Sequence, residues 1–130
     1  MASLFLLKLR AHQVLDACAG QVRLRYITDV PGQQAVYMTK LQQAQAYLVA
    51  RALDADAAVP PYLAAEAGAT GESALQVATA ITGLATVWNE QLGPAIEGAR
   101  LGAKRAVSDA QDEAGVQAAL SAGLAALDAL

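Results

Sequence analysis

Residue types that build metal sites, disulfide frameworks and large cores are scarce in this chain of 130 residues. It contains one cysteine and one histidine. This excludes a zinc site with several cysteine or histidine ligands and a framework of paired cysteines. Aromatic residues make up only 5% of the chain, with Trp88 as the single tryptophan. We expect Trp88 to anchor the core, because its large ring fills space between helices that otherwise offer small side chains.

Charge is limited too, and it is not basic. Nine basic and twelve acidic residues give a net charge of −3, and the isoelectric point is near 4.9. This balance lacks the positive footprint of duplex binding, so we expect no nucleic-acid partner. No apolar run approaches the roughly 20 residues of a membrane span, and Lys8 interrupts the N-terminal run too early for a secretory signal. We therefore expect a soluble chain without a membrane partner.

Alanine is abundant instead, at 32 of the 130 residues. It is the best helix former, and leucine, glutamine, glutamate, arginine and lysine dominate the remainder. These residues predict an all-α fold, a small helical bundle of about four helices in one domain of residues 1–130. We expect residues 1–28 to form a long N-terminal amphipathic helix for oligomerisation or docking, and residues 31–130 to form the bundle.

Turn and capping residues divide the rest of the chain. Pro31 marks the start of a second helix, and residues 54–61, which end in a pair of prolines, form the clearest loop. Thr70 is the expected N-cap after a break at residues 68–71. A long helical segment then covers residues 72–107, with a kink or boundary at residues 93–94. Residues 108–109 are expected to cap a last helix over residues 113–130.

A stripe of apolar residues, spaced three or four apart, runs along the N-terminal segment. It resembles a coiled-coil seam and predicts an interface with an oligomer copy or another partner. The seam residues are Leu4, Leu7, Ala11, Val14, Cys18 and Val22. Residues 22–27 alternate apolar and basic, as a half-buried strand would. We favour helix over this alternative because residues 11–19 have helical spacing.

The start of the N-terminal helix is apolar on a second face as well. Phe5, Leu6 and Leu9 lie among the seam residues, and a four-helix monomer cannot easily cover apolar surface on more than one face. We expect self-association into a closed symmetric assembly, with a trimer favoured over a dimer. The alternative is that the helix docks into a groove on a larger neighbour.

The search for chemistry predicts no catalytic, cofactor-binding or metal-binding residue. His12 has Asp16 one turn later, but no nucleophile or second ligand accompanies this pair. The carboxylates lie on expected solvent faces or in first helical turns. The basic groups are expected to be solvated or paired with acids, and not to contact nucleic acid; they are Arg100, Lys104 and Arg105 in one group, and Arg23 and Arg25 in the other.

Five pieces of the sequence carry a resemblance to a known family. They are residues 25–37, Lys40, residues 45–48, residues 61–67 and residues 96–100. Over about residues 20–107 the chain resembles a small Ala-rich helical module of tailed-bacteriophage virion proteins. The resemblance implies a structural component associated with tail or head fibres, located in the virion and assembled in the host cytoplasm. Its partners would be other virion proteins and copies of itself, as a homotrimer.

Other function classes stay open beside this one. The chain could be a tail or fibre assembly chaperone that is not retained in the virion, with an apolar face that is uncovered in the free state. It could also be a non-viral helical scaffold or coat protein, or a bundle that binds a small molecule. An enzyme is the least favoured class, because no set of residues with complementary catalytic roles is present.

Overall fold

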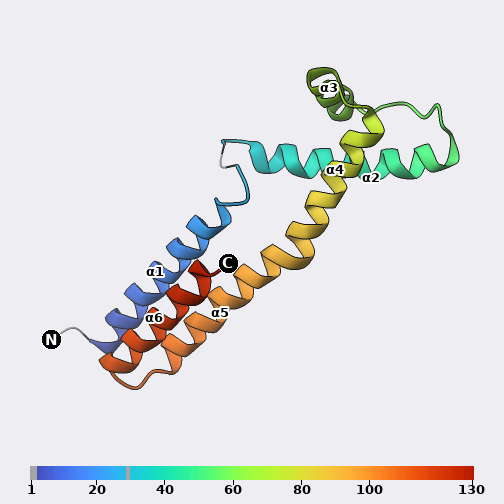
Figure 1. The fold of residues 1–130 in the computed structure, drawn as a ribbon. Coiled ribbons are helices and arrows are strands. Elements are labelled where there is room, and N and C mark those ends of the chain that lie inside the picture. The colour runs from blue at the N-terminus through green and yellow to red at the C-terminus, as the bar shows by residue number, and fades with distance from the viewer. Residues whose placement is uncertain (1–2, 29) are drawn as a thin grey trace. The chain divides into compact units, whose positions relative to one another are not determined.

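The computed structural model describes residues 3–28 and 30–130, and within them the chain is helical without a strand (Figure 1). The helices are α1 (Leu4–Arg23), α2 (Gln33–Leu53), α3 (Pro61–Thr70), α4 (Ala74–Val87), α5 (Gly93–Asp109) and α6 (Glu113–Asp128), with a π-helical segment η1 (Trp88–Leu92). The predicted all-α fold is confirmed, and the strand alternative for residues 22–27 is wrong. The estimate of about four helices is too low for the described residues, since α3 forms separately and η1 interrupts the expected helix over residues 72–107.

The helices group into two compact units, which are described separately. One unit contains residues 3–28 and 90–130, and the other contains residues 30–89. We expected a single domain over residues 1–130. The described helices instead fall into two groups, and the contacts are concentrated within each group. The N-terminal helix does not stand apart from a bundle over residues 31–130, because it packs with α5 and α6.

In the first unit α1, α5 and α6 lie side by side, with α5 antiparallel to both of the others (Figure 1). Its fully buried large side chains are Leu15, Val22, Ile96, Val107 and Leu127. Small residues let the three helices approach closely, and Gly123 lies at the tightest point. A Cβ atom there would lie 2.6 Å from the Cβ of Ala103 and 2.8 Å from the Cδ2 of Leu15. Glycine is therefore a packing requirement at this position.

In the second unit α2 packs along α4, and α3 contacts both. The core is small, as the low aromatic content predicts: it consists of Ala44, Tyr47, Leu63, Val77 and Ala78. The backbone enters α3 through Pro60, with Pro61 as its first helical residue, where the missing N–H of proline costs no helical hydrogen bond. Lys40 of α2 pairs with Glu66 of α3 at 3.0 Å, which joins the two helices beside the core.

Two helix starts differ from the sequence-based expectation. The N-cap of α4 is Ser73 and not Thr70, and a reciprocal capping box forms with Gln76. Thr70 is instead the last residue of α3, and its hydroxyl donates to the Glu66 carbonyl at 2.9 Å. The N-cap of α6 is Asp112, whose carboxylate accepts from the Gly115 N–H. In both cases a polar side chain nearer to the helix satisfies the free N–H groups that a cap must bind.

The kink or boundary expected at Gly93–Pro94 falls where the π-helical segment η1 ends and α5 begins. Pro94 lies in the first turn of α5. In a regular α-helix a proline ring clashes with the carbonyl group four residues earlier, and proline has no N–H to donate to that carbonyl. The widened π turn of η1 immediately precedes α5. Trp88 opens this turn, and the expectation that it anchors the core is wrong, because its ring is only partly buried. The last α4 residue packed on the second unit's core is Ile81, nearly two turns earlier.

Candidate interaction surface

The six predicted seam residues divide between the interior and the surface of the first unit. Ala11 and Val22 are buried among α1, α5 and α6, Val14 is 44% exposed, and the other three are partly buried. The inward stripe of α1 continues through Leu15 and Ala19, which are fully buried. Part of the seam is therefore already used for contacts within the chain, and the remaining part faces outward.

The outward part of the seam borders an open groove between α1 and α6. Leu7, Ala11 and Val14 form one wall, and Val116 and Leu120 form the apolar part of the other. The groove has a volume of about 230 Å³, and its polar lining consists of Arg10, Gln117 and Ser121. The six predicted interface residues lie on α1 alone and do not include the α6 wall. The available signal was the absence of any charged residue between Glu113 and Asp128.

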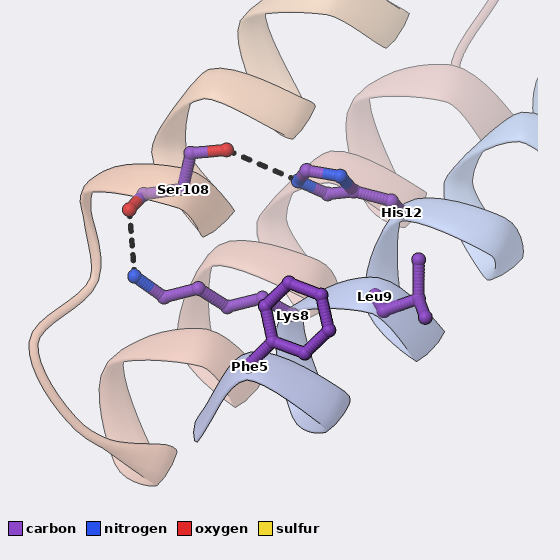
Figure 2. Close-up of a pocket in the computed structure, with 5 residues that line it drawn as sticks. All are labelled: Phe5, Lys8, Leu9, His12 and Ser108. Carbon is purple, nitrogen blue, oxygen red and sulfur yellow. Dashed lines mark hydrogen bonds between the residues drawn. The ribbon is translucent and has the colours of Figure 1, made fainter. Parts of the chain in front are cut away.

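A second hollow lies on the opposite edge of α1, beside the end of α5. Figure 2 shows Phe5, Leu9 and His12 rising from successive turns of α1, with Ser108 facing them and the Lys8 ammonium reaching the Ser108 carbonyl. The volume is about 210 Å³, and the Lys8 Nζ donates to the Ser108 oxygen at 2.6 Å. Phe5 is 73% exposed at its mouth. The second apolar face expected at the start of the chain is thus uncovered in the single chain.

His12 of α1 contacts two groups near the end of α5. Its Nε2 lies 3.1 Å from the Lys104 carbonyl oxygen and 3.2 Å from the Ser108 hydroxyl. The carbonyl oxygen can only accept, so this contact is a hydrogen bond in the tautomer that carries the proton on Nε2. In that tautomer Nε2 cannot also take the serine proton. His12 therefore joins α1 to α5.

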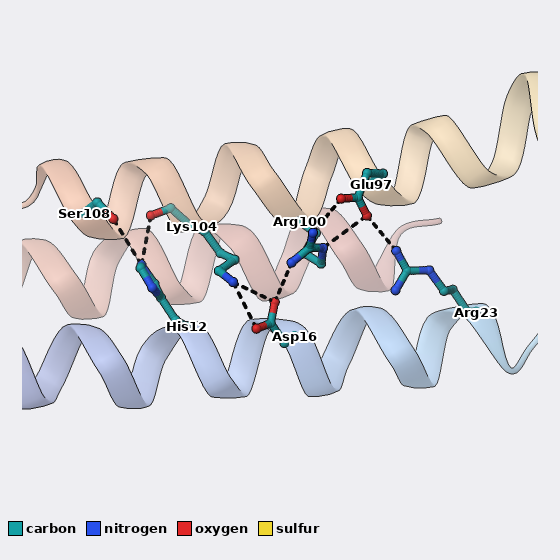
Figure 3. A network of polar contacts seen from close by, with 7 residues as sticks. All are labelled: His12, Asp16, Arg23, Glu97, Arg100, Lys104 and Ser108. Atoms are coloured by element: carbon teal, nitrogen blue, oxygen red, sulfur yellow. Dashed lines mark hydrogen bonds and ion pairs between the residues drawn. The ribbon is translucent and has the colours of Figure 1, made fainter.

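His12 and Asp16, which lie one turn apart on α1, contact different groups of α5. Asp16 accepts hydrogen bonds from Arg100 at 2.8 Å and from Lys104 at 3.0 Å. One turn earlier in α5, Glu97 forms salt bridges with Arg23 at 2.8 Å and with Arg100 at 2.5 Å. Figure 3 shows these groups as one row between α1 and α5. Arg100 and Lys104, two of the three residues in the first basic group, therefore form salt bridges with α1.

The salt bridges of this row lower the pKa values of its two acids, Asp16 and Glu97. Hydrogen bonds from Arg100 and Lys104 hold the pKa of Asp16 below its usual value of 3.8. The hydrogen bond from Arg100 is the main cause that lowers the pKa of Glu97 below 4.5. Each acid is stabilised in its ionised form by a neighbouring cation. The row therefore ties α1 to α5 in one register, in which successive residues along α1 meet successively earlier residues of α5.

Two further basic residues, Arg25 and Arg105, are paired with acids in the first unit. Arg25 binds Asp128 at the end of α6 at 3.1 Å, and the Tyr26 hydroxyl donates to the Leu130 carbonyl. Arg105 pairs with Asp109 within α5 at 3.0 Å. The interpretation of the basic groups as salt-bridge partners is confirmed for these residues. In the described part of the chain, Arg10 and Arg51 make no ion pair.

Cys18, the last seam residue to be placed, is a partly buried free thiol. Burial raises the pKa of this thiol above its usual value, and the nearby Asp128 carboxylate adds to the effect. The thiolate, which is the reactive form, is therefore disfavoured. The environment indicates a packing role for Cys18 on the inner side of α1.

Among residues 3–28 and 30–130, no three histidine, cysteine or acidic side chains gather into a metal site. None of the described helices is both long and apolar enough to cross a membrane. Comparison with family models, curated proteins and solved structures finds no match to this chain.

Proposed function

We propose that this chain is a structural component of a bacteriophage virion, a fibre, fibre-base or head-decoration subunit that works by binding neighbouring protein chains. The observation that carries the proposal is the groove between α1 and α6. Three of the six residues that the sequence selects as a partner interface, Leu7, Ala11 and Val14, line its α1 wall. The virion location rests on the resemblance of residues 20–107 to phage helical modules.

The chemistry of the groove favours a helix as its occupant. The exposed side of α6 carries alanines and no charge between Glu113 and Asp128, so a neighbouring helix can approach closely. Leu7, Val14 and Leu120 offer apolar contacts to the side chains of that helix. Arg10 lies on the groove without an ion pair in the described residues. An amphipathic helix with apolar residues three or four apart and one carboxylate beside them fits this surface.

The proposed subunit has a defined stoichiometry, which makes the proposal measurable. Quantitative mass spectrometry of purified particles from the source should find this chain at a fixed ratio to the major capsid protein. If the chain is abundant in infected lysate but missing from particles, the virion role is wrong and an assembly chaperone is favoured. A source that produces no particles would also overturn the virion role.

The groove is tested separately by substitution. Val14→Asp places a charge in the groove at a residue that is 44% exposed, so the fold should persist and retention in particles should fall. Leu101→Asp is the matched control, since Leu101 is 51% exposed on α5 and does not line the groove. Equal retention of both variants would show that the groove is not the docking site.

A further inference from the structure

We draw no further inference here: the strongest candidate, the apolar hollow that Phe5 and Leu9 line at the start of α1, carries nothing because Lys8 beside it is already bound to the Ser108 carbonyl and nothing in the structure shows what covers this face.

Discussion

The Asp16 carboxylate of α1 lies 2.8 Å from the Arg100 guanidinium of α5, although 84 residues separate the two in the sequence. This pair belongs to the row of charges that joins the two helices in an antiparallel register. The row lies beside an interior of three buried alanines and six larger buried aliphatic side chains. Apolar contacts are not directional, so the matched charges at the edge of this interior favour one register over its alternatives.

The first prediction concerns the pH dependence of this row. Asp16 and Glu97 both have folded-state pKa values below their usual 3.8 and 4.5. Their contribution to stability is therefore present above these values and is lost as the pH falls through the lowered pKa values. We expect the urea midpoint of the parent chain to fall below about pH 4.5. The double variant Asp16→Asn, Glu97→Gln should have a smaller fall in this range, and an unchanged pH profile would contradict the role of the row.

The second prediction concerns the tight approach at Gly123. Gly123→Ala places a methyl group within 2.8 Å of atoms of Ala103 and Leu15, so helices must shift. We expect a loss of about 1–3 kcal/mol in the free energy of unfolding, typical of an overpacked core. Gly98→Ala is the matched control, because nothing lies within 4 Å of its added Cβ. It should gain up to about 1 kcal/mol from helix propensity, and equal effects of both variants would refute the close approach.

The third prediction concerns the start of α4. Ser73→Ala removes the side-chain acceptor that binds the Gln76 N–H at 3.1 Å. The expected loss is about 1 kcal/mol, as for other N-cap serines. Thr70→Ala should destabilise α4 less, because Thr70 ends α3. Hydrogen exchange of the first turn of α4, followed by mass spectrometry, reports on the helix itself, and faster exchange in the Thr70 variant than in the Ser73 variant would reverse the assignment of the cap.

The fourth prediction compares two large residues of the second unit. Leu63 is fully buried, so Leu63→Ala should cost about 2–5 kcal/mol. Trp88 is only partly buried in η1, and Trp88→Ala should cost less despite the larger volume removed. Chemical denaturation of both variants checks the order. A larger loss for the tryptophan variant would mean that the ring has contacts beyond those of the single chain. If those contacts come from another copy, the loss of stability should change when the measurement is repeated at higher protein concentration.

The sequence by itself determined the helical fold and most of its breaks. High alanine content, helical spacing of apolar residues and the prolines at positions 31, 60, 61 and 94 act within a few residues, so they can be interpreted locally. The pairing of basic residues with acids was also predictable as a class. The choice between neighbouring caps was not, because Thr70 and Ser73 are both acceptable residues and packing of α3 against α4 decides which one opens the helix.

Only the tertiary structure decided which side chains meet. The periodicity of α1 allows several adjacent stripes, and the seam that runs through Leu7 and Val14 differs by one position from the buried stripe through Leu15 and Ala19. Contacts between residues about a hundred positions apart, such as Lys8 with Ser108, depend on how three helices pack together. The sequence contains no local signal for them, since the free energy that selects this arrangement comes from burial and charge pairing that exist only after the chain has folded.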